Sequence, residues 1–281
     1  MNDLEELLGG DIVLTPVSVE ADYCKAWRET VLPNWPCTPV ALAIRGGRMA
    51  SQFAEVFIAG YQAAIRATFP QIPFTGLATL AVSEDRNSID PLPGVTWCAC
   101  ADGVELSGYK TWVAACDQVE QLVVKARGQA PGQSGYFLVD VNQPGLLLER
   151  NPDPSMLPQL SQGRARFQAV VLPSNRRVED ALVVGFGRAE ALCIYAAFVA
   201  MVWQQSEQEP VRRKQCHALL RQLSDVELSR VELSQMRGID QGVQSLRRKL
   251  GEEMDSRDAA WLRDQRLIAM YSEGMQNAPS S

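Results

Sequence analysis

The chain has 281 residues and a mass of 31.0 kDa, with 46% hydrophobic and 21% charged residues. This ordinary globular composition excludes disorder and fibrous repeats for most of the chain, and a net charge of −6 argues against nucleic acid as a partner. The single histidine, His217, cannot supply the paired imidazoles of most zinc or iron sites, so we expect no metal centre.

The first zone, residues 1–76, is predicted to be helical. Six prolines separate weak helical signals, and the clearest helix covers residues 48–68. There, apolar residues from Phe53 to Phe69 keep the i, i+3, i+4 spacing of one helix face.

The second zone, residues 77–182, has a β pattern. Its short runs are rich in β-branched and aromatic residues, with Gly, Pro, Asp or Asn in the gaps. Closely spaced strands without helical patterns between them indicate an antiparallel sandwich or barrel. The runs are 77–82, 96–101, 104–106, 122–126, 136–141 and 167–172.

The third zone, residues 183–276, returns to helix and is followed by a tail, residues 277–281, that we expect to be frayed. Helices are predicted over 187–206, 211–237 and 244–274, with Pro210 at a helix start and Gly238 and Gly242 at a break. Long helices with short connections favour an antiparallel bundle. The predicted fold class is α+β.

The apolar run from Ala189 to Trp203 is interrupted by Glu190 and is too short to cross a membrane, so it predicts a buried helix and no membrane partner. The chain starts with acidic residues where a signal peptide carries basic ones. Seven scattered cysteines without a CxxC pair predict reduced thiols and a cytoplasmic location.

Within the β zone, the segment from Asp102 to Val113 reads DGVELSGYKTWV and resembles the middle domain of acyl-CoA dehydrogenases. Ahead of it, the stretch from Leu80 to Glu84 resembles that family's A-x-T-E strand. Weaker matches follow in the family's order, over about a hundred residues, and helical zones flank them as in the family. They are 121–127, 135–140, 144–145 and 167–178.

The resemblance implies N-terminal helices, a β-barrel and a C-terminal bundle, assembled as a homodimer, a homotetramer or a heteromeric partner. Both helical zones are short for the family, so the N-terminal region is expected to be truncated. The implied cofactor is FAD and the implied substrate is an acyl-CoA or another acyl thioester. In the family, a carboxylate removes the α-proton and the β-hydrogen leaves as a hydride to the flavin.

Five residues match positions that contact the flavin in the family. The resemblance places Val82 and Ser83 against the ring, with Ser83 replacing a threonine, and Trp112 with Val113 beside it. Ala114 stands where the family has Thr or Ser, so backbone amides would have to replace that hydroxyl. Trp112 could instead be a core aromatic residue of the barrel.

One further residue of the β zone matches a substrate-binding position. Asp90 retains the last residue of the family's P-G-A-G-S-D stretch, whose glycines this chain lacks. The resemblance therefore implies a substrate contact at Asp90.

Two glutamates are candidates for the catalytic base. The segment from Arg263 to Met275 resembles the family's base-bearing end and offers Glu273, displaced by one residue through Ser272. Such a displacement turns a helix by about 100°, unless the helix has already ended, and Glu273 could instead be a solvated helix-end carboxylate. Some relatives place the base in the first bundle helix, near Glu190, where an apolar helix suits a raised pKa. Glu190 could also be an exposed first-turn acid favoured by the helix dipole.

Two functions follow from these residues. The first is a flavin-dependent dehydrogenase that introduces a double bond into an acyl thioester, with a glutamate base. The second is a noncatalytic relative with a degraded FAD site, acting as a partner subunit or thioester-binding module, because the stretch from Gln204 to Glu209 lacks the family's Arg and Phe. An unrelated α+β protein is the third interpretation.

Overall fold

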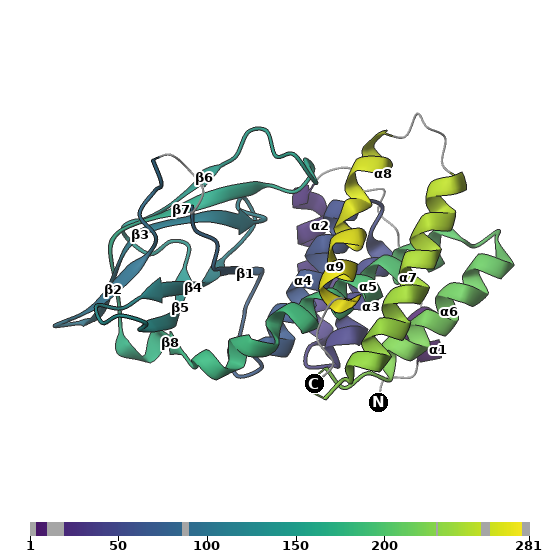
Figure 1. The fold of residues 1–281 in the computed structure, drawn as a ribbon, viewed down its shortest axis with the longest axis horizontal. Coiled ribbons are helices and arrows are strands. Elements are labelled where there is room, and N and C mark those ends of the chain that lie inside the picture. Colours follow the sequence, from purple (N-terminus) through teal and green to yellow (C-terminus); the bar gives the residue numbers. More distant parts are fainter. Residues whose placement is uncertain (1–3, 10–19, 86–89, 229, 254–258, 277–281) are drawn as a thin grey trace. The chain divides into compact units, whose positions relative to one another are not determined.

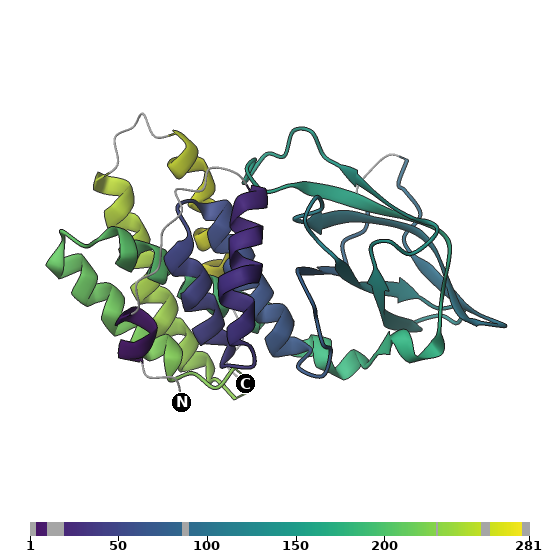
Figure 2. The same cartoon turned by 180° about the vertical axis from the view of Figure 1, so that it is seen from behind.

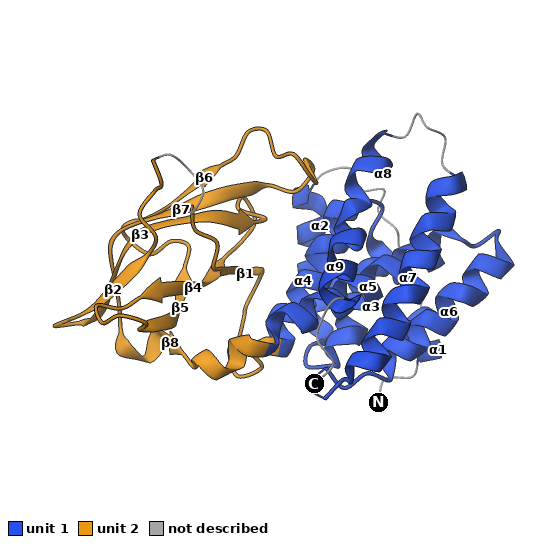
Figure 3. Cartoon of the chain, viewed as in Figure 1, with its two compact units in different colours: residues 1–67, 185–281 blue, residues 68–184 orange. Residues whose placement is uncertain are grey.

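The computed structural model describes residues 4–9, 20–85, 90–228, 230–253 and 259–276. The predicted tail, residues 277–281, lies outside this set. The chain divides into two compact units, a helical unit of residues 1–67 and 185–281 and a β unit of residues 68–184 (Figure 3). The first and third zones of the sequence thus share one unit.

The described strands of the β unit form one eight-stranded sheet in the order β6-β7-β3-β2-β4-β5-β8, with β1 paired to β4 (Figure 1). Pairing is antiparallel except for β1 with β4 and a single parallel pair between β2 and β4. The strands are β1 (Ala78–Ala81), β2 (Thr96–Cys100), β3 (Gly103–Ala114), β4 (Gln121–Arg127), β5 (Ser134–Asp140), β6 (Leu146–Arg150), β7 (Gln162–Leu172) and β8 (Arg177–Val178).

Alternation along the strands builds the core of this unit. In β5, residues at every second position are buried, among them Phe137 and Val139. Val113, Val124 and Phe167 join them from other strands in one hydrophobic cluster. Period-two burial is typical of a sheet with one face packed and the other wet.

The helical unit combines helices from both ends of the chain, which lie side by side in Figures 1 and 2. Short η turns, including η1 (Trp27–Val31) and η2 (Leu32–Asn34), link some of them. The α-helices are α1 (Leu4–Gly9), α2 (Glu20–Ala26), α3 (Pro39–Met49), α4 (Phe53–Thr68), α5 (Phe186–Gln205), α6 (Pro210–Ser224), α7 (Leu233–Glu253), α8 (Ala259–Asp264) and α9 (Arg266–Gln276).

Helix α5 is the centre of the helical unit. Residues 180–205 are long and apolar enough to cross a membrane by length and composition, yet α5 is buried continuously from Ala191 to Trp203. Gly47 of α3 and Gly60 of α4 lie so close to α5 that a Cβ at either would fall 2.2 Å from the Ala197 carbonyl oxygen or 2.5 Å from the Ile194 Cα. Burial therefore confirms the predicted core helix, although the helical stretch is longer than the apolar run indicated.

Some predicted helix boundaries are wrong. The helix predicted over 48–68 begins at Phe53, because Glu55 accepts hydrogen bonds from the backbone N–H and the hydroxyl of Ser51 and thereby caps a new helix. Gly238 and Gly242 do not break a helix: α7 runs through both, and at Gly242 the missing Cβ leaves room for Leu219 of α6.

Candidate functional site

Glu190 lies in the second turn of α5, which begins at Phe186, and its side chain is partly buried. Burial raises its pKa from 4.5 to about 7, and Tyr271 of α9 opposes part of that rise. A carboxylate with a pKa near neutrality can take up and release a proton under physiological conditions. Glu190 is thus not an exposed first-turn acid.

The surroundings of Glu190 are aromatic. Tyr271 lies edge-on to Tyr195 of α5, with ring centroids 6.3 Å apart. Tyr61 of α4 helps raise the pKa of Tyr271 and stacks at 4.9 Å on Phe57. These rings surround Tyr271, and the burial of Glu190 itself disfavours its charged form.

A pocket of about 330 Å³ is lined by residues of α5, α7 and α9, among them Ala191, which follows Glu190 in the chain. Tyr271 forms part of its wall, and three methionines, Met236, Met270 and Met275, supply most of the large apolar surface. Methionine adapts its shape to irregular apolar ligands. Arg188 also lines the pocket, so one cation stands beside its apolar wall.

Glu273, the other predicted base, lies on the exposed side of α9. The helix continues to Gln276, so the one-residue displacement turns Glu273 away from the side that Tyr271 presents to Glu190. Ser272 donates a hydrogen bond of 2.8 Å to Asp240 of α7.

The predicted flavin contacts of the β unit fall into two groups. Val82 and Ser83 follow β1 and are exposed, and Trp112 of β3 is partly exposed, with its indole N–H donating to Gln162 at 3.1 Å. Val113 and Ala114 are buried, and the Ala114 carbonyl accepts from Thr79. The Trp112 side chain therefore reaches the surface, and its indole N–H is held by Gln162.

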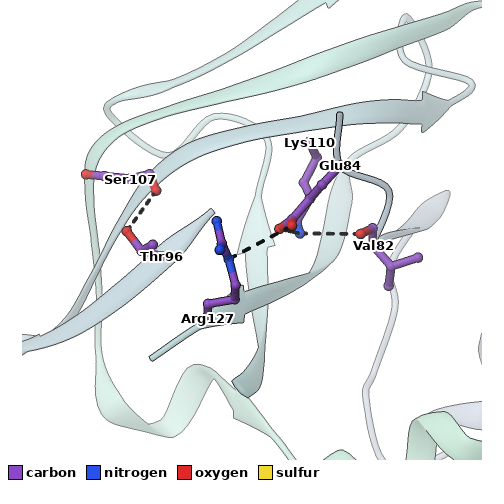
Figure 4. A network of polar contacts seen from close by, with 6 residues as sticks. All are labelled: Val82, Glu84, Thr96, Ser107, Lys110 and Arg127. Carbon is purple, nitrogen blue, oxygen red and sulfur yellow. Dashed lines mark hydrogen bonds and ion pairs between the residues drawn. The ribbon is translucent and has the colours of Figure 1, made fainter. Parts of the chain in front are cut away.

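A buried lysine holds the segment that carries Val82 and Ser83 (Figure 4). The ammonium group of Lys110 lies 2.7 Å from Oε1 of Glu84 and 3.5 Å from the Val82 carbonyl oxygen. The backbone N–H of Thr111 also donates to the Ser83 carbonyl at 3.0 Å. These contacts fix the backbone from 82 to 84 against β3.

Asp90, the predicted substrate contact, is exposed in the β unit. Residues 86–89, which precede it, lie outside the described set. A substrate contact at Asp90 therefore stays a prediction.

The segment from Gln204 to Glu209 was singled out because it lacks the residues that hold a dinucleotide. Gln204 accepts a hydrogen bond from Arg48 at 3.1 Å, and Ser206 donates to the Val202 carbonyl at 2.7 Å. Glu209 forms an ion pair with Arg212 at 2.5 Å. These polar groups are bonded to Arg48, Arg212 and the backbone. The segment itself contains no cation that could pair with a diphosphate.

Sequence reasoning missed Tyr271 and Asp240. Asp240 sits on the apolar face of α7 between Met236 and Val243, a spacing that signals a buried acid. Tyr271 carried no signal, because its partner Glu190 lies 81 positions earlier in the sequence.

No protein-family model and no curated protein sequence match this chain. Solved structures match its fold. A structure described as an FAD-dependent dehydrogenase has a TM-score of 0.66 at 13% identity, over 97% of this chain and 94% of the other. The acyl-CoA dehydrogenase from Geobacillus kaustophilus gives 0.62 at 11% identity, over 92% and 93% of the two chains. The prolyl acyl carrier protein oxidase AnaB gives 0.65 at 12% identity, over 92% and 85%.

These likenesses confirm the predicted α+β class and the acyl-CoA dehydrogenase-like arrangement of helices, strands and helices. At identities this low, they concern the fold alone.

Proposed function

We propose, from this acyl-CoA dehydrogenase-like fold, that the protein is a flavin-dependent oxidoreductase that forms a carbon–carbon double bond in an acyl thioester. The observation that carries the proposal is the partly buried carboxylate of Glu190. Burial raises the pKa of this group to about 7. Fold alone does not specify chemistry, so the proposal rests on this site.

In the proposed reaction, the Glu190 carboxylate takes the proton from the carbon next to the thioester carbonyl. The next carbon loses its hydrogen as a hydride, and the electron pair of the broken C–H bond at the first carbon forms the double bond. A bound flavin supplies the hydride acceptor. Burial keeps Glu190 basic enough to accept the proton.

The residues of the β unit fit one end of such a flavin. Val82 exposes 37% of its surface and Trp112 presents an indole, so both offer area for a flat ring. Val113 and Ala114, being buried, would act by packing behind that surface. Contacts to the diphosphate would have to come from residues other than 204–209.

The pocket beside Tyr271 would hold the acyl group. Its volume of about 330 Å³ lies at the lower end of the range for small-molecule sites, which favours a short chain. Asp90 would contact the rest of the thioester. An oligomer and a cytoplasmic location remain predictions.

A noncatalytic role is the second candidate. It is favoured by the segment from Gln204 to Glu209, where an acid replaces the cation that would neutralise a phosphate and the polar groups satisfy each other. In that case the chain would bind an acyl thioester or a partner subunit without flavin.

Flavin binding separates the two candidates. The purified protein is titrated with FAD while absorbance and flavin fluorescence are recorded, and the loaded protein is mixed anaerobically with short-chain acyl-CoAs. The proposal predicts a yellow protein whose flavin band is bleached by substrate. A protein that stays colourless in excess FAD excludes the oxidoreductase.

The base assignment is tested in the same assay. Bleaching should be lost in Glu190→Gln and kept in Glu273→Gln, which is the matched control on α9. Bleaching retained in Glu190→Gln would remove Glu190 from the mechanism.

A further inference from the structure

Arg188 of α5 is the one charged residue among the described residues that line the pocket of about 330 Å³ in the helical unit. Its side chain is exposed, and it makes no hydrogen bond or ion pair with any residue that the structure describes. The rest of the described lining is apolar except for the Tyr271 hydroxyl. A ligand that fills this pocket therefore meets a positive charge at one side and apolar groups elsewhere.

Helix α5 lines the pocket through Gly187, Arg188 and Ala191. Because each residue turns a helix by about 100°, Gly187 and Ala191 lie between Glu190 and Arg188 around the helix axis. Glu190 stands about 60° beyond Gly187 on one side, and Arg188 stands about 60° beyond Ala191 on the other. The acid and the cation thus flank a strip of helix that bears only the side chains of glycine and alanine.

The space over this strip is open. A Cβ built at Gly187 has no atom within 4 Å, and the same holds at Gly274 of α9, which also lines the pocket. Met236 and Met275 are buried in the lining, whereas 56% of Met270 is exposed. A short run of methylene groups on the strip would contact these methionines, while its two ends would approach Glu190 and Arg188.

We propose that Arg188 is a specificity-determining residue that binds a carboxylate at the far end of the acyl group, so that the substrate is a monothioester of a short dicarboxylic acid. The inference deepens the proposed function and rests on this pocket as the acyl site. A guanidinium group holds a carboxylate through two parallel N–H···O bonds, which a methyl end cannot form. Because Arg188 is exposed, water weakens this pair and the preference is moderate.

The test measures binding by calorimetry in the full chain without added flavin. Glutaryl-CoA and pentanoyl-CoA are compared, because their acyl chains have the same length and differ only in ending on a carboxylate or a methyl group. Glutaryl-CoA should bind about tenfold more tightly, a difference of about 1.4 kcal/mol. Arg188→Gln should abolish this preference, and Arg188→Lys should keep part of it, because lysine retains the charge but not the paired bonds.

The matched control is Arg266→Gln, which removes an equal charge from an exposed position at the start of α9 that does not line the pocket. It should leave the preference unchanged. Gly187→Leu, which fills the open space, should weaken the binding of both thioesters about tenfold or more while urea unfolding shows an intact fold.

Equal affinity for the two thioesters, no binding of either, or a preference that survives Arg188→Gln would overturn the inference. An equal loss of preference in Arg266→Gln would also overturn it, because the effect would then come from the overall charge. Calorimetry needs no flavin, so a failure of flavin bleaching would refute the proposed function and leave this preference measurable. Bleaching by pentanoyl-CoA without a preference for glutaryl-CoA would refute the inference alone.

Discussion

Oε1 of Glu84 lies 2.7 Å from Nζ of Lys110, whose side chain is wholly buried while 15% of the glutamate side chain is exposed. Burial lowers the pKa of Lys110, and Glu84 opposes that change. Arg127 contributes a longer contact to Glu84 at 4.0 Å. Loss of the partner should therefore matter more for Lys110 than for Glu84, because Glu84 also lies near Arg127 and some water.

This asymmetry predicts that Glu84→Gln destabilises the protein more than Lys110→Met does. Glu84→Gln leaves a buried ammonium group without its counter-charge and should cost about 3 kcal/mol, whereas Lys110→Met should cost about half of that. Urea unfolding measures both. Arg150→Met, which removes an exposed ion pair with Asp117, should cost under about 1 kcal/mol. A larger loss in Lys110→Met than in Glu84→Gln would contradict the argument.

Glu190 should make stability depend on pH. Its pKa is raised from 4.5 to about 7, so the folded state favours the protonated form. The stabilisation is fully present below about pH 4.5 and is lost as the pH rises through about 7. From near pH 5 to near pH 8, the wild type should lose roughly 2 kcal/mol relative to Glu190→Gln, less than the full shift implies because Glu190 is only partly buried. Urea unfolding at both pH values checks this, and exposed Glu273→Gln should follow the wild type.

Gly47 should tolerate no side chain. A Cβ would lie 2.2 Å from the Ala197 carbonyl oxygen, and backbone cannot move aside as a side chain can. Gly47→Ala should therefore destabilise the helical unit by about 3 kcal/mol. Gly238→Ala is the matched control within a helix: nothing lies within 4 Å of its Cβ, and alanine should stabilise α7 by up to about 1 kcal/mol. Thermal unfolding separates the two, and equal effects would refute the close approach.

The predicted flavin contacts should separate by mutation. Trp112→Phe should weaken FAD binding with little change in stability, because Trp112 is partly exposed. Val113→Ala should cost roughly 1–2 kcal/mol of stability and leave FAD affinity unchanged, because Val113 is in the core. Flavin fluorescence titration and urea unfolding measure both. A weaker FAD affinity in Val113→Ala at unchanged stability would reverse this assignment.

Patterns among neighbouring residues in the sequence predicted several of the strands. The β-branched runs predicted β1, β2, β4 and β5 to within a few residues. The strand predicted at 104–106 extends to Ala114 because residues 108–114 pair with β7, a partner that no window around residue 110 contains. Strand β8 has two residues and no period to detect.

The same limit applies to the candidate site. Glu190 was recognisable because a carboxylate interrupts an apolar helix, and its raised pKa follows from that placement. Tyr271 was not, since its effect on the pKa of Glu190 depends on how α9 packs on α5, and α9 is also bonded to Asp240 and Gln244 of a third helix, α7.

The close approach of α3 to α5 joins chain segments about 150 positions apart, while the β unit is one continuous stretch. During synthesis, residues 68–184 are therefore available to fold before α5 has been made, whereas α3 and α4 must wait for it. Until then, the apolar faces around Gly47 and Gly60 have no partner. We therefore expect the chain to need protection from aggregation during its synthesis on the ribosome more than after folding.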